Sequence, residues 1–291
     1  MNPPSGSRSS NTVTRERLRR VEGRHNALVK EVRRAFSRGQ LTENGDCAIE
    51  GLRVVEEAIR SGVRFQAVFF SESGKNLAER LLPQIGSHVE TLVLPDKLFA
   101  GMVDSETPQG VAALVHYKQK SVANVLERAD TGPVVVVAGL QDPGNLGTIV
   151  RSAEAFGAAG VLLGEGTVSP FNPKVVRGTA GSIFRLPIAQ GKTSEIVSEV
   201  RASGVRLVAT SSHKGVPLPE ANLALPLAVL VGGEGAGVSK DLLGKVDGIV
   251  AIPHSPQVES LNAGVATSIV LYEIARRQLS ALSTQHSAGG T

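Results

Sequence analysis

One stretch limits the fold of this chain more than any other, the uninterrupted apolar run PVVVVAGL at residues 133–140. A half-exposed strand alternates apolar and polar side chains, whereas a continuous apolar run predicts a strand buried on both faces. Such strands lie at the centre of parallel sheets that are covered by helices. The run therefore predicts an α/β domain in which this strand is central.

Predicted strands and helices alternate on both sides of this run. Before it we expect strands ending at Ile49 and over 64–71, 89–94 and 110–117, with helices over 51–62, 76–85 and 95–102. After it we expect helices over 146–157, 193–204, 239–246 and 260–279, a loop and helix over 169–184, and strands over 160–164, 205–212, 227–234 and 248–253. The alternation predicts a disordered basic arm (1–24), a small α/β domain (25–118), a linker (119–132), a parallel-sheet domain (133–282) and a tail (283–291).

The composition excludes several classes of protein. Aromatic residues make up only 3% of the 291 residues and Trp is absent, which argues against the base-stacking platforms of many single-strand RNA binders. A single cysteine, Cys47, excludes a disulfide framework and a cysteine-based zinc site. No apolar run approaches the roughly 20 residues that span a membrane. We therefore expect a cytoplasmic protein that has neither a membrane segment nor a metal ion.

Positive charge is concentrated at the N-terminus. Residues 1–40 hold ten Lys or Arg against three Glu, a net of +7, although the whole chain carries only +4. Basic N-terminal arms commonly contact nucleic-acid phosphates. A solubilising tail is the alternative interpretation.

Ligands of parallel sheets bind outside the carboxyl ends of the strands, and three loops at such positions stand out. In the first, Asn145 is expected to cap a helix that ends at Gly157. Arg151 lies on this helix, with Glu154 three residues later as a natural ion-pair partner. Taken alone, this segment is better explained as a capped helix that carries a surface salt bridge.

The other two loops carry more polar groups or glycines than a simple turn needs. Residues 232–237, GGEGAG, would let the backbone approach a flat ligand closely and would display Glu234 at the lip. Glu259, Ser260 and Asn262 all precede the last helix, where one capping side chain would suffice. This excess of polar groups suggests that something besides the helix is held there.

In order and spacing, the three loops resemble the motifs of the SpoU/TrmH branch of the SPOUT RNA methyltransferases. That pattern is N-x-G-x-x-x-R, then a G-x-E-G-x-G loop, then I-P and E-S-L-N before the final helix. The matching residues here are Asn145, Gly147, Arg151, 232–237, Ile252, Pro253 and 259–262. The likeness spans roughly 133–280, and the stretches 48–59 and 105–114 are similar to the family's RNA substrate-binding domain.

This resemblance implies a trefoil-knotted SPOUT domain with a parallel sheet, preceded by a small ribosomal-protein-like α/β domain. It implies a homodimer that holds S-adenosylmethionine largely through backbone groups of Gly232, Ile252 and Leu261. It also implies methyl transfer to a ribose 2′-OH of RNA, without a metal. The resemblance of the N-terminal domain favours ribosomal RNA over transfer RNA.

The resemblance also suggests roles for five side chains. A guanidinium rarely loses its proton, so we assign Arg151 to clamping a phosphate, with Asn145 orienting it. The proton of the 2′-OH would pass to a phosphate, to a water or to Glu234. Ser260 and Asn262 would orient the ribose and shape the loop.

Two departures from the family pattern and two competing functions remain. Gly233 stands where relatives often carry Asn, which would loosen that loop, and His254 lies in an unusual PHSPQ segment. A lone His is more often structural or solvent-facing than catalytic. A non-catalytic RNA-binding or ribosome-assembly protein would not need the five polar site residues, and a small-molecule methyltransferase would not need the basic arm.

Overall fold

Contacts within the chain separate it into two units, which are described in turn. The computed structural model describes residues 17–212, 214–235 and 237–288. The first unit comprises residues 1–118 together with 169–184, and the second comprises 119–168 and 185–291. The disorder predicted for residues 1–16 and the last three residues of the predicted tail lie outside the described residues.

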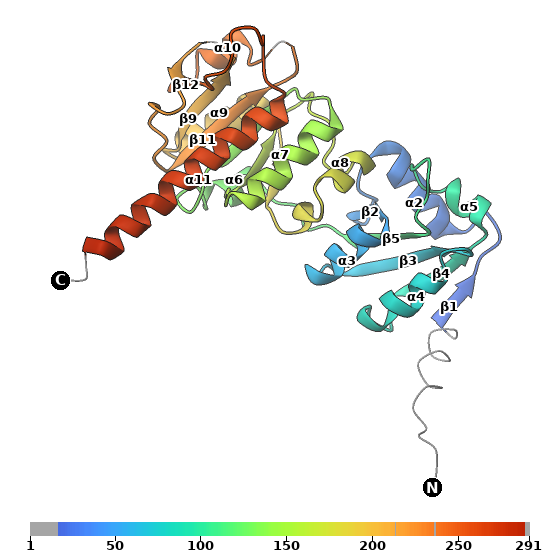
Figure 1. The fold of residues 1–291 in the computed structure, drawn as a ribbon. Coiled ribbons are helices and arrows are strands. Elements are labelled where there is room, and N and C mark those ends of the chain that lie inside the picture. The colour runs from blue at the N-terminus through green and yellow to red at the C-terminus, as the bar shows by residue number, and fades with distance from the viewer. Residues whose placement is uncertain (1–16, 213, 236, 289–291) are drawn as a thin grey trace. The chain divides into compact units, whose positions relative to one another are not determined.

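The first unit is built on a five-stranded mixed sheet in the order β1-β4-β3-β5-β2. β1, β4 and β3 run parallel, and β5 is antiparallel to both β3 and β2. The strands are β1 (Leu18–Arg20), β2 (Asp46–Glu50), β3 (Phe65–Ser71), β4 (Glu90–Leu94) and β5 (Val111–His116). The helices are α2 (Ala27–Arg38), α3 (Leu52–Arg60), α4 (Asn76–Leu81) and α5 (Asp96–Ala100). The predicted small α/β domain is thereby confirmed (Figure 1).

Helix α2 shows how local sequence sets these elements. The Asn26 side chain accepts hydrogen bonds from the amides of Leu28 and Val29 at the helix start. Gly39, at φ 57°, ends the helix in the left-handed conformation that favours glycine. Between them Val29, Val32 and Phe36 recur at helical spacing and pack into the core of the unit. The opposite face of α2 is left to solvent.

Residues 17–24 differ from the predicted disordered arm. Leu18–Arg20 form β1, which pairs in parallel with β4 at the sheet edge. The Arg17 guanidinium donates to the carbonyl oxygens of Leu82, Ile85 and Gly86 at 2.8, 3.2 and 2.8 Å. Backbone pairing and a carbonyl-binding arginine thus order this stretch. Apolar periodicity could not indicate it, because two of the three strand residues are arginines.

Residues 169–184 were predicted within the parallel-sheet domain, but they pack with the first unit. Their helix α8 (Pro173–Gly178) contacts β2, and the Phe171 ring meets the Tyr117 ring edge-on at a centroid distance of 4.8 Å. Arg177 on α8 places Nη1 3.7 Å from Oε2 of the buried Glu50. Burial raises the pKa of Glu50, with Arg177 opposing the shift. Packing and charge contacts with residues that are distant in the sequence therefore hold this segment in the first unit.

The second unit contains a seven-stranded sheet in the order β10-β12-β9-β11-β6-β7-β8, in which each strand runs parallel to its neighbours. Its strands are β6 (Val134–Ala138), β7 (Gly160–Leu163), β8 (Ile188–Gln190), β9 (Arg206–Ser211), β10 (Val216–Pro217), β11 (Leu227–Gly232) and β12 (Gly248–Ala251). The apolar run at 133–140 thus supplies a central strand, as predicted. β8 and β10 were not predicted, since strands of two or three residues are too short to show periodicity.

Helices cover both faces of this sheet. The helices are α6 (Val122–Leu126), α7 (Pro143–Ala155), α9 (Thr193–Ala202), α10 (Lys240–Leu243) and α11 (Ala263–Ala288). Alternate residues of the strands pack against α6 and α9, while α7 and α11 lie side by side (Figure 1). Within the described residues, no helix is both long and apolar enough to cross a lipid bilayer.

Two predicted boundaries differ from the structure. The predicted linker includes α6, whose Val125 and Leu126 are buried in the core of the second unit. Helix α11 begins at Ala263 rather than Ser260, and it continues to Ala288, past the predicted domain end at 282. Neither Gly nor Pro occurs between Ala263 and Ala288 except Gly264 in the first turn, so nothing in the sequence stops the helix earlier.

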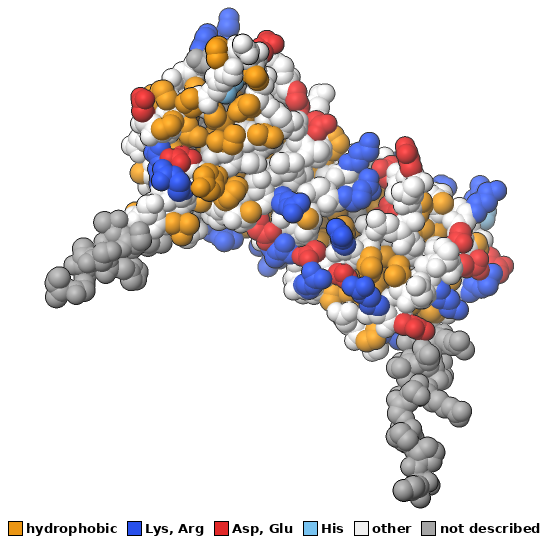
Figure 2. Space-filling view, in the orientation of Figure 1, with side chains coloured by type: hydrophobic (Ala, Val, Ile, Leu, Met, Phe, Trp, Pro, Cys, Tyr) orange, Lys and Arg blue, Asp and Glu red, His pale blue; other side chains and the backbone are white. Residues whose placement is uncertain are grey.

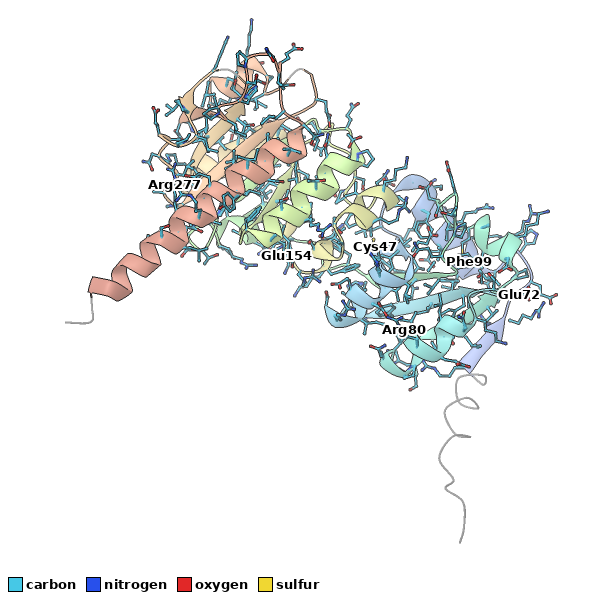
Figure 3. All side chains as sticks on the ribbon, in the orientation of Figure 1. Cys47, Glu72, Arg80, Phe99, Glu154 and Arg277 are labelled. Atoms are coloured by element: carbon cyan, nitrogen blue, oxygen red, sulfur yellow. The ribbon has the colours of Figure 1, made fainter. Side chains whose placement is uncertain are left out.

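Arg277 ties α11 to the turn after β10. It donates to the carbonyl oxygens of Ala221, Leu218 and Pro219 at 2.6, 2.8 and 2.9 Å, and to Glu273 at 2.7 Å (its position is labelled in Figure 3). Hydrogen bonds from Arg276 and Arg277 lower the pKa of Glu273 to about 2. The contribution of Glu273 to stability should therefore be complete at neutral pH and be lost as pH falls from about 4 towards 2.

Arg277→Met should destabilise the second unit by about 1–3 kcal/mol, because three carbonyl oxygens lose a charged donor. Arg276→Met is the matched control, since among the described residues the Arg276 side chain hydrogen-bonds only to the Glu273 carboxylate, at the surface. It should cost less than about 1 kcal/mol. Urea unfolding followed by circular dichroism measures both changes. Equal midpoint shifts for the two variants would show that the carbonyl contacts contribute nothing.

Candidate active site

The site forms where two neighbouring strands end at the same level. β11 pairs with β6 so that Gly232 lies opposite Ala138, the last residue of each strand. The loop after β6 and the loop after β11 therefore leave the carboxyl edge of the sheet side by side. Because β6 continues to β7 on its other side, this is the point where strand order reverses and where ligands of open parallel sheets bind.

The glycine loop after β11 is tightly folded. A Cβ on Gly232 would come within 2.1 Å of the Gly237 carbonyl carbon, and one on Gly233 within 2.4 Å of the Gly139 oxygen. The Gly237 amide donates to the Gly233 oxygen at 3.1 Å, which closes the loop. Gly235 and Gly237 both have positive φ, at 79° and 62°. The close backbone approach leaves no space for a side chain at Gly233. That Gly233 loosens this loop stays a prediction.

Glu234 joins this loop to the loop after β6. Its Oε1 accepts from Asn145 Nδ2 at 2.8 Å, and its Oε2 accepts from the Gln141 amide at 3.2 Å. Burial acts to raise the pKa of Glu234, but the hydrogen bonds from Asn145 and nearby backbone amides outweigh it and lower the pKa. The side chain is thus an ionised clamp between two loops rather than a free group at the lip.

The start of α7 differs from the prediction in its capping residue. Asp142, rather than Asn145, is the N-cap, and its Oδ1 accepts from the Asn145 amide at 2.7 Å. Pro143 follows as the first helical residue, a position that suits its fixed φ and missing amide proton. Capping by Asp142 leaves the Asn145 side chain free to reach Glu234. The helix ends before Gly157 at φ 71°, as predicted.

Arg151 does not form the predicted ion pair. Glu154 instead accepts from Arg185 Nε and Nη2 at 2.5 and 3.0 Å, a bidentate contact on α7 (Glu154 is labelled in Figure 3). The Arg151 side chain is exposed and has neither a hydrogen bond nor an ion pair to any residue in the described part of the chain. A charged donor on the same helix as Asn145 is therefore available to an outside ligand.

The third loop leads from β12 into α11. Asn262 Oδ1 accepts from the Val265 amide at 3.1 Å, so Asn262 supplies the single cap that the helix needs. His254 Nδ1 lies 2.7 Å from the Ile252 oxygen, which makes His254 a structural partner of this loop. Ser260 remains exposed beside the cap. Of these polar groups, Asn262 caps the helix, and Ser260 faces the space in front of it.

These loops enclose one cavity of about 530 Å³. Seven of the eight predicted site residues line it, and the exception is Arg151. The seven are Asn145, Gly232, Glu234, Ile252, Ser260, Leu261 and Asn262. The sheet and the helix starts therefore bring together segments that are more than 100 positions apart in the sequence.

Sequence reasoning missed one wall of the cavity. Thr210, Ser211, Ser212 and Lys214, from the end of β9 and the loop after it, also line the space. β9 lies between β11 and β12 in the sheet, so its loop necessarily lies between theirs. The signal was present, since the predicted strand at 205–212 ends in a run of hydroxyl side chains.

Comparison with known proteins agrees with this geometry. Residues 132–272 match the SpoU rRNA methylase family, and residues 26–113 match the MRM3-like substrate binding domain. The chain is 32% identical over 258 residues to the 23S rRNA (guanosine(2553)-2′-O)-methyltransferase RlmP of Bacillus subtilis, covering 88% of this chain and 99% of that protein. It is 35% identical to an uncharacterized tRNA/rRNA methyltransferase of Synechocystis, covering 91% and 96%.

A solved structure shows the same likeness in three dimensions. The AdoMet-bound rRNA methyltransferase from Sinorhizobium meliloti superposes with a TM-score of 0.77 at 28% identity, covering 90% of this chain and 99% of that one. The likeness extends through both units rather than the parallel sheet alone. The chain therefore belongs to the SpoU rRNA methylase family.

Proposed function

We propose that this chain transfers a methyl group from S-adenosylmethionine to a ribose 2′-OH of ribosomal RNA. Family membership makes it an RNA methyltransferase, and its relative RlmP is named for 2′-O-methylation of 23S rRNA. The observation that carries the proposal is the convergence of the three motif loops on one cavity. An RNA substrate and a buried unpaired Cys47 support a cytoplasmic location.

The cavity fits the cofactor in size and chemistry. Its volume of about 530 Å³ lies within the ~300–1,000 Å³ typical of small-molecule sites. Val231, Ile252 and Leu261 supply an apolar wall that suits a flat ring, and the tight glycine loop exposes backbone groups rather than side chains. We assign cofactor binding to Gly232, Ile252 and Leu261. S-adenosylmethionine supplies a methyl group already activated on a sulfonium, so the protein has to position the reactants.

Glu234 and Asn145 are best assigned as positioning residues. The lowered pKa makes the Glu234 carboxylate a weak base, and both of its oxygens already accept hydrogen bonds. The carboxylate fixes the separation of two loops that line the cavity. We therefore assign proton removal to a water or a substrate phosphate, and we no longer assign Asn145 to orienting Arg151, because its amide donates to Glu234.

Arg151, Ser260 and Asn262 are proposed to bind the RNA. Arg151 is exposed and unpartnered among the described residues, and it can clamp a phosphate beside the reacting ribose in a bidentate contact. The cap uses only Oδ1 of Asn262, so its amide nitrogen can still donate to a ribose oxygen. Ser260 adds a hydroxyl at the same helix start.

We also infer a homodimer formed through α11. Val265, Tyr272 and Leu279 recur every seventh residue, and these residues are 47, 54 and 68% exposed. Apolar side chains gather over α11 and the neighbouring strands in Figure 2, a surface of the kind that protein interfaces cover. Purified protein that sediments as a monomer at micromolar concentration would contradict this inference.

The trefoil knot expected from the resemblance remains a proposal. Its support is the chain path, since the segment after β12 must pass from beside β9 to α11, where Ser268 bonds Ser152 on α7 at 2.7 Å. The path therefore crosses the ends of β9 and β11 that carry the cavity loops. An experimental structure whose chain path forms no knot would contradict this proposal.

The purified protein should methylate ribosomal RNA from cells that lack its gene. With labelled S-adenosylmethionine, the label should appear in a 2′-O-methylated nucleoside after digestion. Gly232→Ala is the inactive control, because its Cβ would displace the Gly237 backbone. If the label appears only in transfer RNA, transfer RNA is the substrate and ribosomal RNA is not. Absence of label from every cellular RNA would refute methyl transfer.

Glu234→Gln should lower the single-turnover methylation rate by less than about 10-fold. Gln keeps an oxygen that accepts from Asn145, whereas loss of a general base typically costs 10²–10⁴-fold. Glu234→Ala, which removes the whole clamp, should lower the rate further. The pH–rate profile should show no step assignable to Glu234 between pH 6 and 9, because its lowered pKa keeps it ionised. A 10³-fold loss in Glu234→Gln would instead identify it as the base.

Arg151→Lys and Arg151→Ala should both lower the single-turnover rate, each by about 10–100-fold, because a misplaced substrate costs factors of this size. Lysine retains the charge but cannot form the two parallel hydrogen bonds of a guanidinium. Arg201→Lys, at an exposed position on α9, is the control and should match the wild type. If Arg151→Lys keeps most of the activity, the bidentate clamp is not required.

A further inference from the structure

The solvent face of α2 carries four cations. Lys30, Arg33, Arg34 and Arg38 are all exposed, on the side opposite Val29, Val32 and Phe36 in the core. Lys30, Arg34 and Arg38 are spaced by four residues, so they follow one another about one helical turn apart. The acidic Glu31 lies at the margin of this face and is half-buried.

Most of these cations lack the acidic partners found elsewhere on the unit. Arg19 pairs with Glu90, and Arg60 and Arg80 pair with acids of α3. Figure 2 shows such mixing of basic and acidic side chains over α3 and α4. On α2, in contrast, the side chains of Lys30, Arg33 and Arg38 have neither a hydrogen bond nor an ion pair to any residue that the structure describes.

A groove runs along this face. A cavity of about 440 Å³ lies between α2 and residues 40–44, with Lys30, Arg34 and Arg38 on one side. Gln40, Thr42 and Asn44 supply polar groups on the other side. The acids Glu31 and Glu43 also line it, and Glu43 makes only a long contact of 3.8 Å with Arg34. The groove is open and carries a net positive charge, with three cations against two acids.

A second cavity lies beside the first. It has a volume of about 340 Å³, and Asn44 lines both. Arg64, Gln66, His88 and the acidic Asp46 also line the second cavity. The second cavity thus adds the exposed cation Arg64 beside the groove.

We propose that this α2 track, defined by Lys30, Arg34, Arg38, Asn44 and Arg64, binds the sugar-phosphate backbone of the RNA substrate. A nucleic-acid strand carries one phosphate per nucleotide, which matches a file of cations one turn apart better than a single anion does. The exposed face of α2 carries none of the large apolar residues by which amphipathic helices enter a lipid surface. The proposal rests on the function proposed above.

The test compares two triple variants of the full-length protein that remove the same charge. The track variant is Lys30→Gln with Arg34→Gln and Arg38→Gln. The control variant is Arg53→Gln with Lys75→Gln and Lys97→Gln, three exposed cations of the same unit that line neither cavity. All six substitutions lie at the surface, and thermal unfolding verifies that both variants fold. Filter binding to ribosomal RNA fragments measures affinity at several salt concentrations.

The track variant should bind RNA at least about 10-fold more weakly at physiological salt. Its slope of log K against log salt should fall by about 2–3, because each lost phosphate contact removes 0.7–0.9 of slope. Adding Arg64→Gln should lower the slope by about 1 more. The control variant should match the wild type. Calorimetric affinity for S-adenosylmethionine should be the same in all proteins, since none of these residues lines the other cavity.

Two results would overturn the proposal. The track variant could keep the wild-type slope, or both variants could weaken equally, which would show only a dependence on net charge. These results leave the proposed function intact if the wild type still methylates RNA. A wild type that binds no RNA would overturn both.

Discussion

The active site depends on the parallel pairing of β6 with β11 in a register that places Gly232 beside Ala138. A slip of one residue would turn every buried valine of these strands to the opposite face. The register also sets the level at which two loops leave the sheet. Glu234 then reaches Asn145 across the gap, and the close approach of Gly233 to Gly139 admits no side chain. Core packing thus determines the geometry of the cavity.

Much of the fold and most of the site could be predicted because their signals are local. The apolar run at 133–140 identified the central strand, and the order of three polar loops identified seven residues that do line one cavity. Loops after parallel strands meet at one edge, so locating the strands was enough to group their loops. Ligand roles remain assignments, because proximity alone does not establish contact with a substrate.

The features that were not predicted depend on contacts between segments that are distant in the sequence. Hydrophobic periodicity carries no information about such contacts. The order of strands in the sheet brought the loop after β9 into the cavity, although its hydroxyl run was visible in the sequence. Glu154 pairs with Arg185 instead of Arg151. Asp142, and not Asn145, caps the helix. Residues 169–184 pack with the first unit through the contacts of Arg177 and Phe171. In each case the local sequence offered more than one possible contact partner. Tertiary packing decided which contact forms.

The most direct measurement is amide hydrogen exchange of the purified protein with and without S-adenosylmethionine. If distant loops form one binding crevice, the cofactor should slow exchange together in residues 139–146, 209–212, 232–238 and 252–263. The amides of α2 should be unaffected. Protection confined to one of these segments, or absent from all of them at saturating cofactor, would contradict the shared crevice on which the proposed chemistry rests.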